Sequence, residues 1–125
     1  MKKQRPVHLN LFQIKLPING IVSLLHRLSG ALLFLILPFV LWVFQTSLSS
    51  ENSFYSLTNT IKYSIFLKFI IIFIAWAMLH HLMAGMRFLL LDVHWGVELR
   101  QSRLSAKWVM LMSAASTVLI MVWLW

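Results

Sequence analysis

The stretch IFLKFIIIFIAWAMLHHLMAGMRFLLL, residues 65–91, decides how this chain folds. It is almost wholly apolar, with one lysine near its start and two histidines and an arginine in its second half. A helix needs roughly 20 apolar residues to cross about 30 Å of hydrocarbon, so this stretch is long enough to span a membrane. The sequence therefore predicts a transmembrane helix that carries polar groups in need of partners.

Two further apolar runs, at residues 28–48 and 108–125, lie on either side of this stretch. With their flanking residues, the three runs predict spans at about 20–48, 63–92 and 104–125. Hydrophobic residues make up 60% of the 125-residue chain and charged residues only 11%, which leaves no room for a separate soluble domain. We expect an all-α membrane protein with three transmembrane helices, forming a single membrane-anchor domain over residues 1–125.

Residues 1–18 precede the first span and mix basic and apolar side chains with Pro6 and Pro17. Because proline disfavours a continuous helix, we expect an arm that lies at the membrane interface or under a partner. No small-residue cleavage pattern follows the first apolar run, so the N-terminus is expected to be retained. Asn19 is placed to cap the helix that follows the arm.

Two polar connections are expected between the spans. Residues 46–60 are rich in Ser, Thr and Asn, which predicts a polar loop. Residues 92–107 form a second, charged connection. Pro38 lies inside the first span and removes one backbone donor, which predicts a kink in that helix.

Basic residues are distributed unevenly along the chain. Nine of the 11 Lys and Arg residues precede the first span or flank the second connection, whereas Lys62 and Lys68 flank the first connection. The positive-inside rule places the N-terminus and the second connection in the cytoplasm and the C-terminus in the periplasm. The net charge of +8 is then mostly topological, so nucleic acid is not an expected partner. The chain has no cysteine, which excludes disulfides and thiolate metal ligands.

His81 is the first candidate metal ligand. It lies eleven residues before Asp92, which places it roughly 16 Å deeper along a straight helix, near the middle of the membrane. A neutral imidazole at that depth is a natural axial ligand for haem iron, and Gly85 on the same face would leave room for a macrocycle. Phe88 and Asp92 continue this face. A histidine that hydrogen-bonds to a neighbouring helix would fit the same spacing.

The neighbouring polar residues of this span face another way. His80 is rotated by about 100° from His81 and groups with Ala84 and Arg87, so the two histidines cannot both point at one iron. Spacing alone does not choose between them, although the glycine favours His81. Arg87 fits two roles, a topology anchor that reaches the headgroups or a partner of an anionic group such as a haem propionate.

A second polar group lies at the start of the first span. Ser23 and Arg27 are four residues apart and share a helix face, with His26 beside them. A hydroxyl, a fixed cation and an imidazole could hydrogen-bond a quinone carbonyl, and a capped helix start with a basic anchor fits equally well. In the last span, Ser113 and Thr117 have the small-xxx-small spacing of close helix packing.

These motifs together resemble those of the cytochrome b membrane-anchor subunit of bacterial succinate dehydrogenase. The resemblance covers essentially the whole chain. It rests on QRPVHLNL (4–11), on PINGIVSLLHRLSG (17–30) with the pattern S-x-x-H-R-x-S-G, on HLMAGMRFLLLD (81–92) with the pattern H-x-x-x-G-x-R, and on SAK (105–107). The order and spacing of these segments within three spans make coincidence improbable.

The resemblance implies a subunit without a complete active site of its own, within succinate:ubiquinone oxidoreductase in the bacterial inner membrane. A flavoprotein subunit would oxidise succinate, an iron-sulfur subunit would pass electrons onward, and a second hydrophobic anchor subunit would pack against this chain. His81 would be the axial ligand of a haem b shared with that anchor. Ser23 and Arg27 would contact ubiquinone, and His26 and Arg27 would lie near the haem propionates. Higher oligomers of the four-subunit complex are compatible with this reading.

Two features depart from the family pattern. Close members commonly have histidine directly after the motif arginine, where this chain has Phe88, and His80 is unusual beside the ligand position. Two other classes of function remain alternatives: a purely structural anchor of a peripheral enzyme, and a small transporter with a polar path through His80, His81 and Arg87. The chain shows no inverted repeat, which speaks against a transporter.

Overall fold

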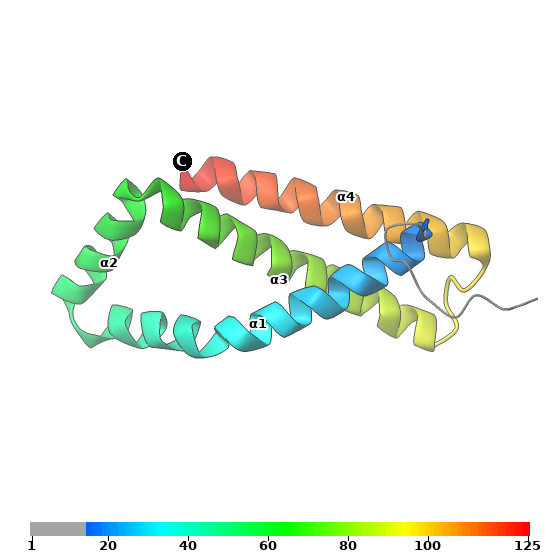
Figure 1. Ribbon diagram of the computed structural model, residues 1–125, viewed down its shortest axis with the longest axis horizontal. Helices are drawn as coiled ribbons and strands as arrows, with labels where there is room; N and C mark the ends of the chain where they lie inside the picture. The colour runs from blue at the N-terminus through cyan, green and yellow to red at the C-terminus, as the bar shows by residue number, and fades with distance from the viewer. Residues whose placement is uncertain (1–14) are drawn as a thin grey trace, which may run out of the picture.

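The computed structural model describes residues 15–125, which form four helices (Figure 1): α1 (Ile18–Ser49), α2 (Glu51–Tyr63), α3 (Ile65–Asp92) and α4 (Leu99–Leu124). Helices α1, α3 and α4 are long and apolar enough to cross a membrane. The prediction of an all-helical chain with three apolar spans is therefore confirmed. The predicted arm lies largely outside the described residues, since only residues 15–17 of it precede α1.

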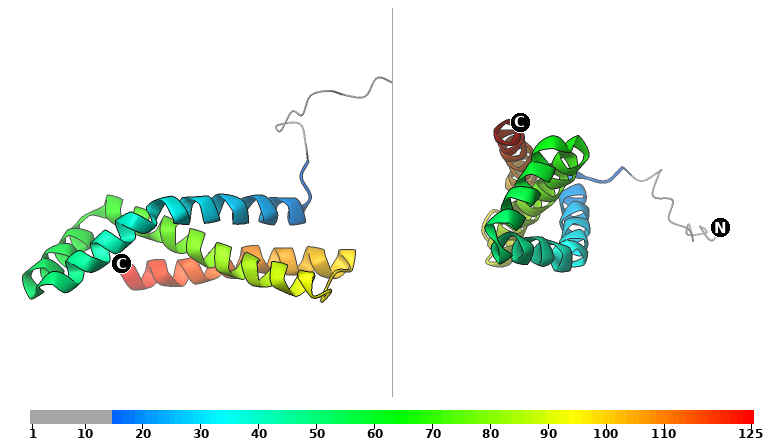
Figure 2. Two further views of the ribbon diagram at one scale, coloured as in Figure 1. Left: turned by 90° about the horizontal axis from the view of Figure 1, so that it is seen from below. Right: turned by 90° about the vertical axis from the view of Figure 1, so that its left-hand side faces the viewer.

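Helices α3 and α4 run antiparallel, and α1 crosses beside them (Figures 1 and 2). The start of α1 and the α3–α4 connection lie at one end, where Asn19 Nδ2 donates to Ser102 Oγ at 3.0 Å. At the opposite end, Lys68 Nζ lies 4.8 Å from the ring centre of Trp125. The first turns of α1 and the second connection thus share one end of the molecule.

The core of the chain is built from small and polar residues at helical spacing. The inner face of α3 carries Ala77, His80, Ala84 and Arg87, and that of α4 carries Ala106, Val109, Ser113 and Thr117. Ser113 is fully buried and Thr117 nearly so, which confirms the packing role predicted for them. Small side chains let two helix backbones approach closely, as membrane helices require.

Residues 51–63 are helical, so the predicted loop over residues 46–60 is wrong. Ser50 Oγ accepts a hydrogen bond from the Ser53 backbone N–H at 3.1 Å and caps α2, and Glu51 occupies its first turn, where a negative charge is favoured. Leu57 and Ile61, one turn apart, line an apolar pocket with residues of α1 and α3. The serines and asparagines that suggested a loop instead supply the cap and the exposed face of a short amphipathic helix.

The second connection is shorter than predicted. Helix α4 begins at Leu99, so Arg100, Arg103 and Lys107 lie on a helix and only residues 93–98 form the turn. This turn is tight, with positive φ angles of 62° at His94 and 74° at Gly96.

The start of α1 also differs from the prediction. Pro17 is the N-cap residue and Asn19 lies inside the first turn, with its side chain bonded to Ser102 instead of to the helix backbone. Helix α1 continues through Pro38 and changes direction in its second half (Figures 1 and 2). The missing N–H of a proline accounts for such a bend.

Candidate functional site

Two histidines from different helices meet between α1 and α3. The His26 and His81 rings stack with 4.2 Å between their centroids and 9° between their planes. The Phe88 ring lies 5.2 Å from the His26 ring, and a Cβ at Gly85 would lie 3.5 Å from His26 Nε2. His81, Gly85 and Phe88 therefore share one face of α3, as their spacing predicted. Within the chain, the space beside Gly85 is occupied by the His26 imidazole.

The hydrogen bonds of His81 define its tautomer. Its Nδ1 lies 3.0 Å from the His26 carbonyl oxygen and 3.3 Å from Ser29 Oγ. A carbonyl oxygen can only accept, and the Ser29 hydroxyl already donates to that same oxygen at 3.0 Å. Nδ1 must therefore carry the proton, which leaves the Nε2 lone pair of a neutral His81 free to bind a metal.

Gly30 makes room for the His81 ring. A Cβ at Gly30 would lie 2.8 Å from His81 Cε1, closer than side chains tolerate, and 3.3 Å from Nδ1. Ser29 is buried beside it. Both residues belong to the S-x-x-H-R-x-S-G pattern, but sequence reasoning assigned them no role. Their spacing of three and four residues from His26, which places all three on one helix face, is the signal that could have found them.

The predicted quinone ligands lie on the same part of α1. Ser23 is half-buried and Arg27 is exposed, and no hydrogen bond joins their side chains within residues 15–125. The exposed Arg27 side chain can contact a group outside the chain. His26, half-buried between them and the His81 ring, connects the two predicted sites.

His80 occupies a different environment from His81. It is fully buried, its ring stacks on Trp76 with centroids 5.5 Å apart, and neither ring nitrogen has a hydrogen-bond partner among the described residues. His81 is half-buried and lies on the face that α1 covers only in part. A metal-bearing group that approaches from outside the chain can therefore reach His81 more readily than His80.

Arg87 makes its polar contacts inside the chain. Its side chain is 6% exposed, Nε donates to Ser105 Oγ at 3.0 Å, and Nη2 donates to Asn19 Oδ1 at 3.3 Å and to Ser102 Oγ at 3.1 Å. The guanidinium carbon lies 5.2 Å from the Phe88 ring centre. These contacts join three helices, a role that neither of the two predicted readings included.

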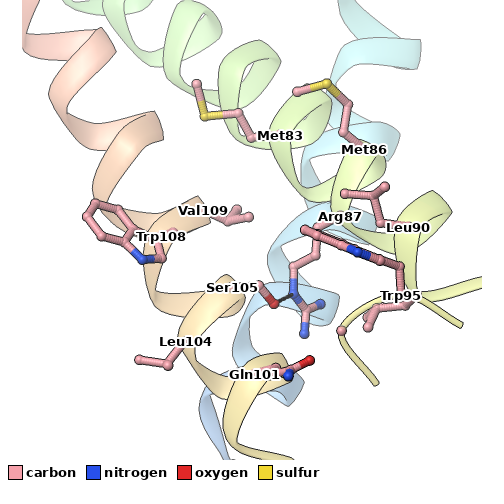
Figure 3. Close-up of a pocket in the computed structure, with 12 residues that line it drawn as sticks. Met83, Met86, Arg87, Leu90, Trp95, Gln101, Leu104, Ser105, Trp108 and Val109 are labelled. Carbon is pink, nitrogen blue, oxygen red and sulfur yellow. Dashed lines mark hydrogen bonds between the residues drawn. The ribbon is translucent and has the colours of Figure 1, made fainter. Parts of the chain in front are cut away.

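A cavity of about 680 Å³ opens between α3 and α4 (Figure 3). Met83 and Met86 line one part of it and Gln101 and Leu104 another, with Arg87 and its bond to Ser105 between them. None of Ser23, His26, Arg27 and His81 lines this cavity. It is therefore separate from the predicted ligand site.

Comparison with known proteins identifies the family of this chain. Residues 1–120 match the family described as succinate dehydrogenase/fumarate reductase transmembrane subunit. The chain belongs to this family. It is 34% identical to the succinate dehydrogenase cytochrome b556 subunit of Coxiella burnetii over the full length of both chains. The cytochrome b556 subunit of Paracoccus denitrificans is 28% identical, with 94% of this chain and 90% of that one covered. The cytochrome b560 subunit of Reclinomonas americana is 36% identical over 79% of this chain and 72% of that one.

The predicted resemblance to a cytochrome b anchor subunit of succinate dehydrogenase is thus confirmed. The chain is a membrane subunit of that enzyme complex. Its three apolar helices and its bacterial relatives indicate a multi-pass protein of the inner membrane.

Proposed function

We propose that this succinate dehydrogenase subunit binds haem b and ubiquinone and passes electrons from the iron-sulfur subunit of the complex to ubiquinone. Its further partners are a flavoprotein subunit and a second hydrophobic anchor, which contributes the other haem ligand. The N-terminus and the α3–α4 connection face the cytoplasm. The observation that carries the proposal is the 3.0 Å contact between His81 Nδ1 and the His26 carbonyl oxygen, which assigns the proton to Nδ1 and leaves Nε2 for iron.

His81 would suit a ligand of haem iron in three respects. Its ring is oriented by the His26 carbonyl and Ser29, its space is secured by Gly30, and its side chain is only half-buried. A carbonyl oxygen that accepts from the other ring nitrogen holds a ligating imidazole in place and raises its basicity. Haem b, when bound, supplies a one-electron redox centre in the membrane.

The start of α1 provides the groups that ubiquinone reduction needs. The exposed Arg27 guanidinium offers a fixed positive charge to an oxygen that gains negative charge, and the Ser23 hydroxyl offers a hydrogen bond to a quinone carbonyl. His26, beside Arg27, and the exposed Asp92 are the proposed proton relays from the cytoplasmic side. His26, whose ring stacks on His81, and the adjacent Arg27 are the proposed partners of the haem propionates.

The quinone assignment is tested by Arg27→Leu in the assembled complex. We expect quinone reductase activity to fall on the order of a hundredfold, while succinate oxidation by an artificial soluble acceptor stays largely intact. Arg103→Leu, which removes another exposed cation at the same end, is the matched control and should change neither activity. Unchanged quinone reductase activity in Arg27→Leu would contradict the assignment, whereas equal loss of both activities would indicate failed assembly.

The haem assignment is tested by His81→Leu beside His80→Leu. The first substitution should alter the optical and EPR spectra of the haem, and the second should leave them unchanged, because His80 lies inside the chain. A normal spectrum in His81→Leu would show that another residue is the haem ligand. Absence of both haem and quinone from the purified complex would favour the purely structural anchor.

A further inference from the structure

Asn19 joins the start of α1 to both other spans through its amide group. Its Nδ2 donates to Ser102 Oγ at 3.0 Å, and its Oδ1 accepts from Arg87 Nη2 at 3.3 Å. Asn19 and Ser102 are 83 residues apart in the chain, and Asn19 and Arg87 are 68 apart. We call Asn19, Arg87 and Ser102 the three-helix clamp, because each comes from a different helix.

The positive charge of Arg87 makes the hydrogen bonds of this clamp necessary. The whole chain contains three acidic residues, and none of them forms an ion pair with Arg87 in the part of the chain that the structure describes. Neutral oxygens therefore solvate a buried cation: besides the Asn19 oxygen, these are Ser102 O and Oγ at 3.1 Å each and Ser105 Oγ at 3.0 Å. A buried charge that loses an acceptor is costly, so the three helices are held in one arrangement.

The clamp acts on the turns of α1 that carry the proposed quinone ligands. Asn19, Ser23 and His26 follow at intervals of four and three residues and so share one face of the helix, with Arg27 beside them. A shift of α1 by one residue would rotate these side chains by about 100°. Because both the oxygen and the nitrogen of the Asn19 amide are hydrogen-bonded, Asn19 sets the rotation and register of the first turns of α1.

We infer that Asn19 and Arg87 are positioning residues for ubiquinone, which hold the first turns of α1 so that Ser23 and Arg27 face the quinone. This inference rests on the proposed function. It assigns Arg87 to the clamp, since its Nε and Nη2 donors bond to Asn19, Ser102 and Ser105.

The test uses Asn19→Ala in the complete complex, with a short-chain ubiquinone as acceptor. The KM for the quinone should rise roughly tenfold, as expected for loss of hydrogen bonds to a charged group, while kcat changes less. The haem spectrum and the rate with an artificial soluble acceptor should stay normal. Alanine is a better helix former than asparagine, so fraying of α1 would not explain such a rise.

Two variants separate positioning from general damage. Asn19→Asp keeps an acceptor for Arg87 and can accept from the Ser102 hydroxyl, so it should keep the KM near that of the unaltered complex. Ser105→Ala removes the Arg87 Nε acceptor but keeps every hydrogen bond between α1 and the other helices, so it should raise the KM much less than Asn19→Ala does. If Asn19→Ala prevents assembly, Ser102→Ala tests the same link and should raise the KM, because it removes the acceptor of Asn19 Nδ2.

An unchanged KM in Asn19→Ala, or in Ser102→Ala where the former does not assemble, would overturn the inference. So would an equal rise in Ser105→Ala and Asn19→Ala, or a failure of Asn19→Asp to restore the KM. If Arg27→Leu impairs quinone reduction and Asn19→Ala does not, only the positioning role is wrong. If neither variant affects quinone reduction, the proposed quinone site is wrong as well.

Discussion

Gly30→Ala is the substitution that tests the histidine site most directly. The added methyl group would lie 2.8 Å from His81 Cε1, whereas carbon atoms in contact are about 3.5–4.0 Å apart. The imidazole would have to move by roughly 0.7 Å or more. Since the ring is stacked against His26 and bonded to its carbonyl oxygen, such a movement disturbs both contacts.

The size of the effect follows from these two contacts. Overpacking of a filled site costs about 1–3 kcal/mol, and loss of the partner that orients a ligating histidine lowers metal affinity by about 10–100-fold. We expect Gly30→Ala to reduce the haem content of the purified complex and to shift its reduced-minus-oxidised spectrum. The measurement is the ratio of haem to protein together with that spectrum.

Two other glycines provide controls for Gly30→Ala. A Cβ at Gly20 would lie 3.6 Å from Pro17 Cδ, an ordinary contact, so Gly20→Ala should bind haem normally. At Gly85 the nearest atom of the chain, His26 Nε2, is 3.5 Å away, so Gly85→Ala is tolerated within the chain itself. Full haem content with an unchanged spectrum in Gly30→Ala would refute the reasoning. Loss of haem in Gly85→Ala alone would show that space beside Gly85 is what the haem requires.

Two further predictions concern stability. His80→Leu replaces a buried imidazole, whose nitrogens have no hydrogen-bond partner among residues 15–125, with an apolar side chain, so the thermal midpoint of the complex should stay the same or rise; a drop of several degrees would show that the imidazole has a partner in the complex. Ser50→Ala removes the cap of α2, which is worth about 1 kcal/mol, so the Ser53 amide should exchange its hydrogen about fivefold faster. Unchanged exchange would mean that packing on α1 and α3 holds α2 without the cap.

Much of the structure of this protein could be predicted from local patterns in its sequence. The length of three apolar runs predicted three spans, because the thickness of a bilayer sets a minimum helix length. The 3.6-residue period predicted that His81, Gly85 and Phe88 share a face and that His80 belongs with Ala84 and Arg87. The signature motifs indicated the family, which the match over residues 1–120 confirms.

Predictions from local sequence patterns were wrong where a helix cap or a contact with a neighbouring helix had more influence than the local composition. The serine-rich segment after α1 was predicted to be a loop, but Ser50 caps a helix there, and Leu57 and Ile61 of that helix line an apolar pocket with residues of α1 and α3. Asn19 was predicted to cap α1, but its amide group forms hydrogen bonds with Ser102 of α4 and Arg87 of α3 instead. In each case the polar side chain is compatible with both the predicted and the observed structure, and contacts with neighbouring residues determine which one forms.

The sequence by itself thus determined the number of spans, the faces of each helix and the family. Only the tertiary structure decided which faces meet, because periodicity within one helix carries no information about the helix opposite. The proton on His81 Nδ1 depends on the His26 carbonyl, 55 residues away. The need for glycine at residue 30 depends on the His81 ring, and the placement of Arg87 depends on Asn19 and Ser102. Contacts between residues so far apart form only when the helices pack, and these contacts bring the polar residues together in one site.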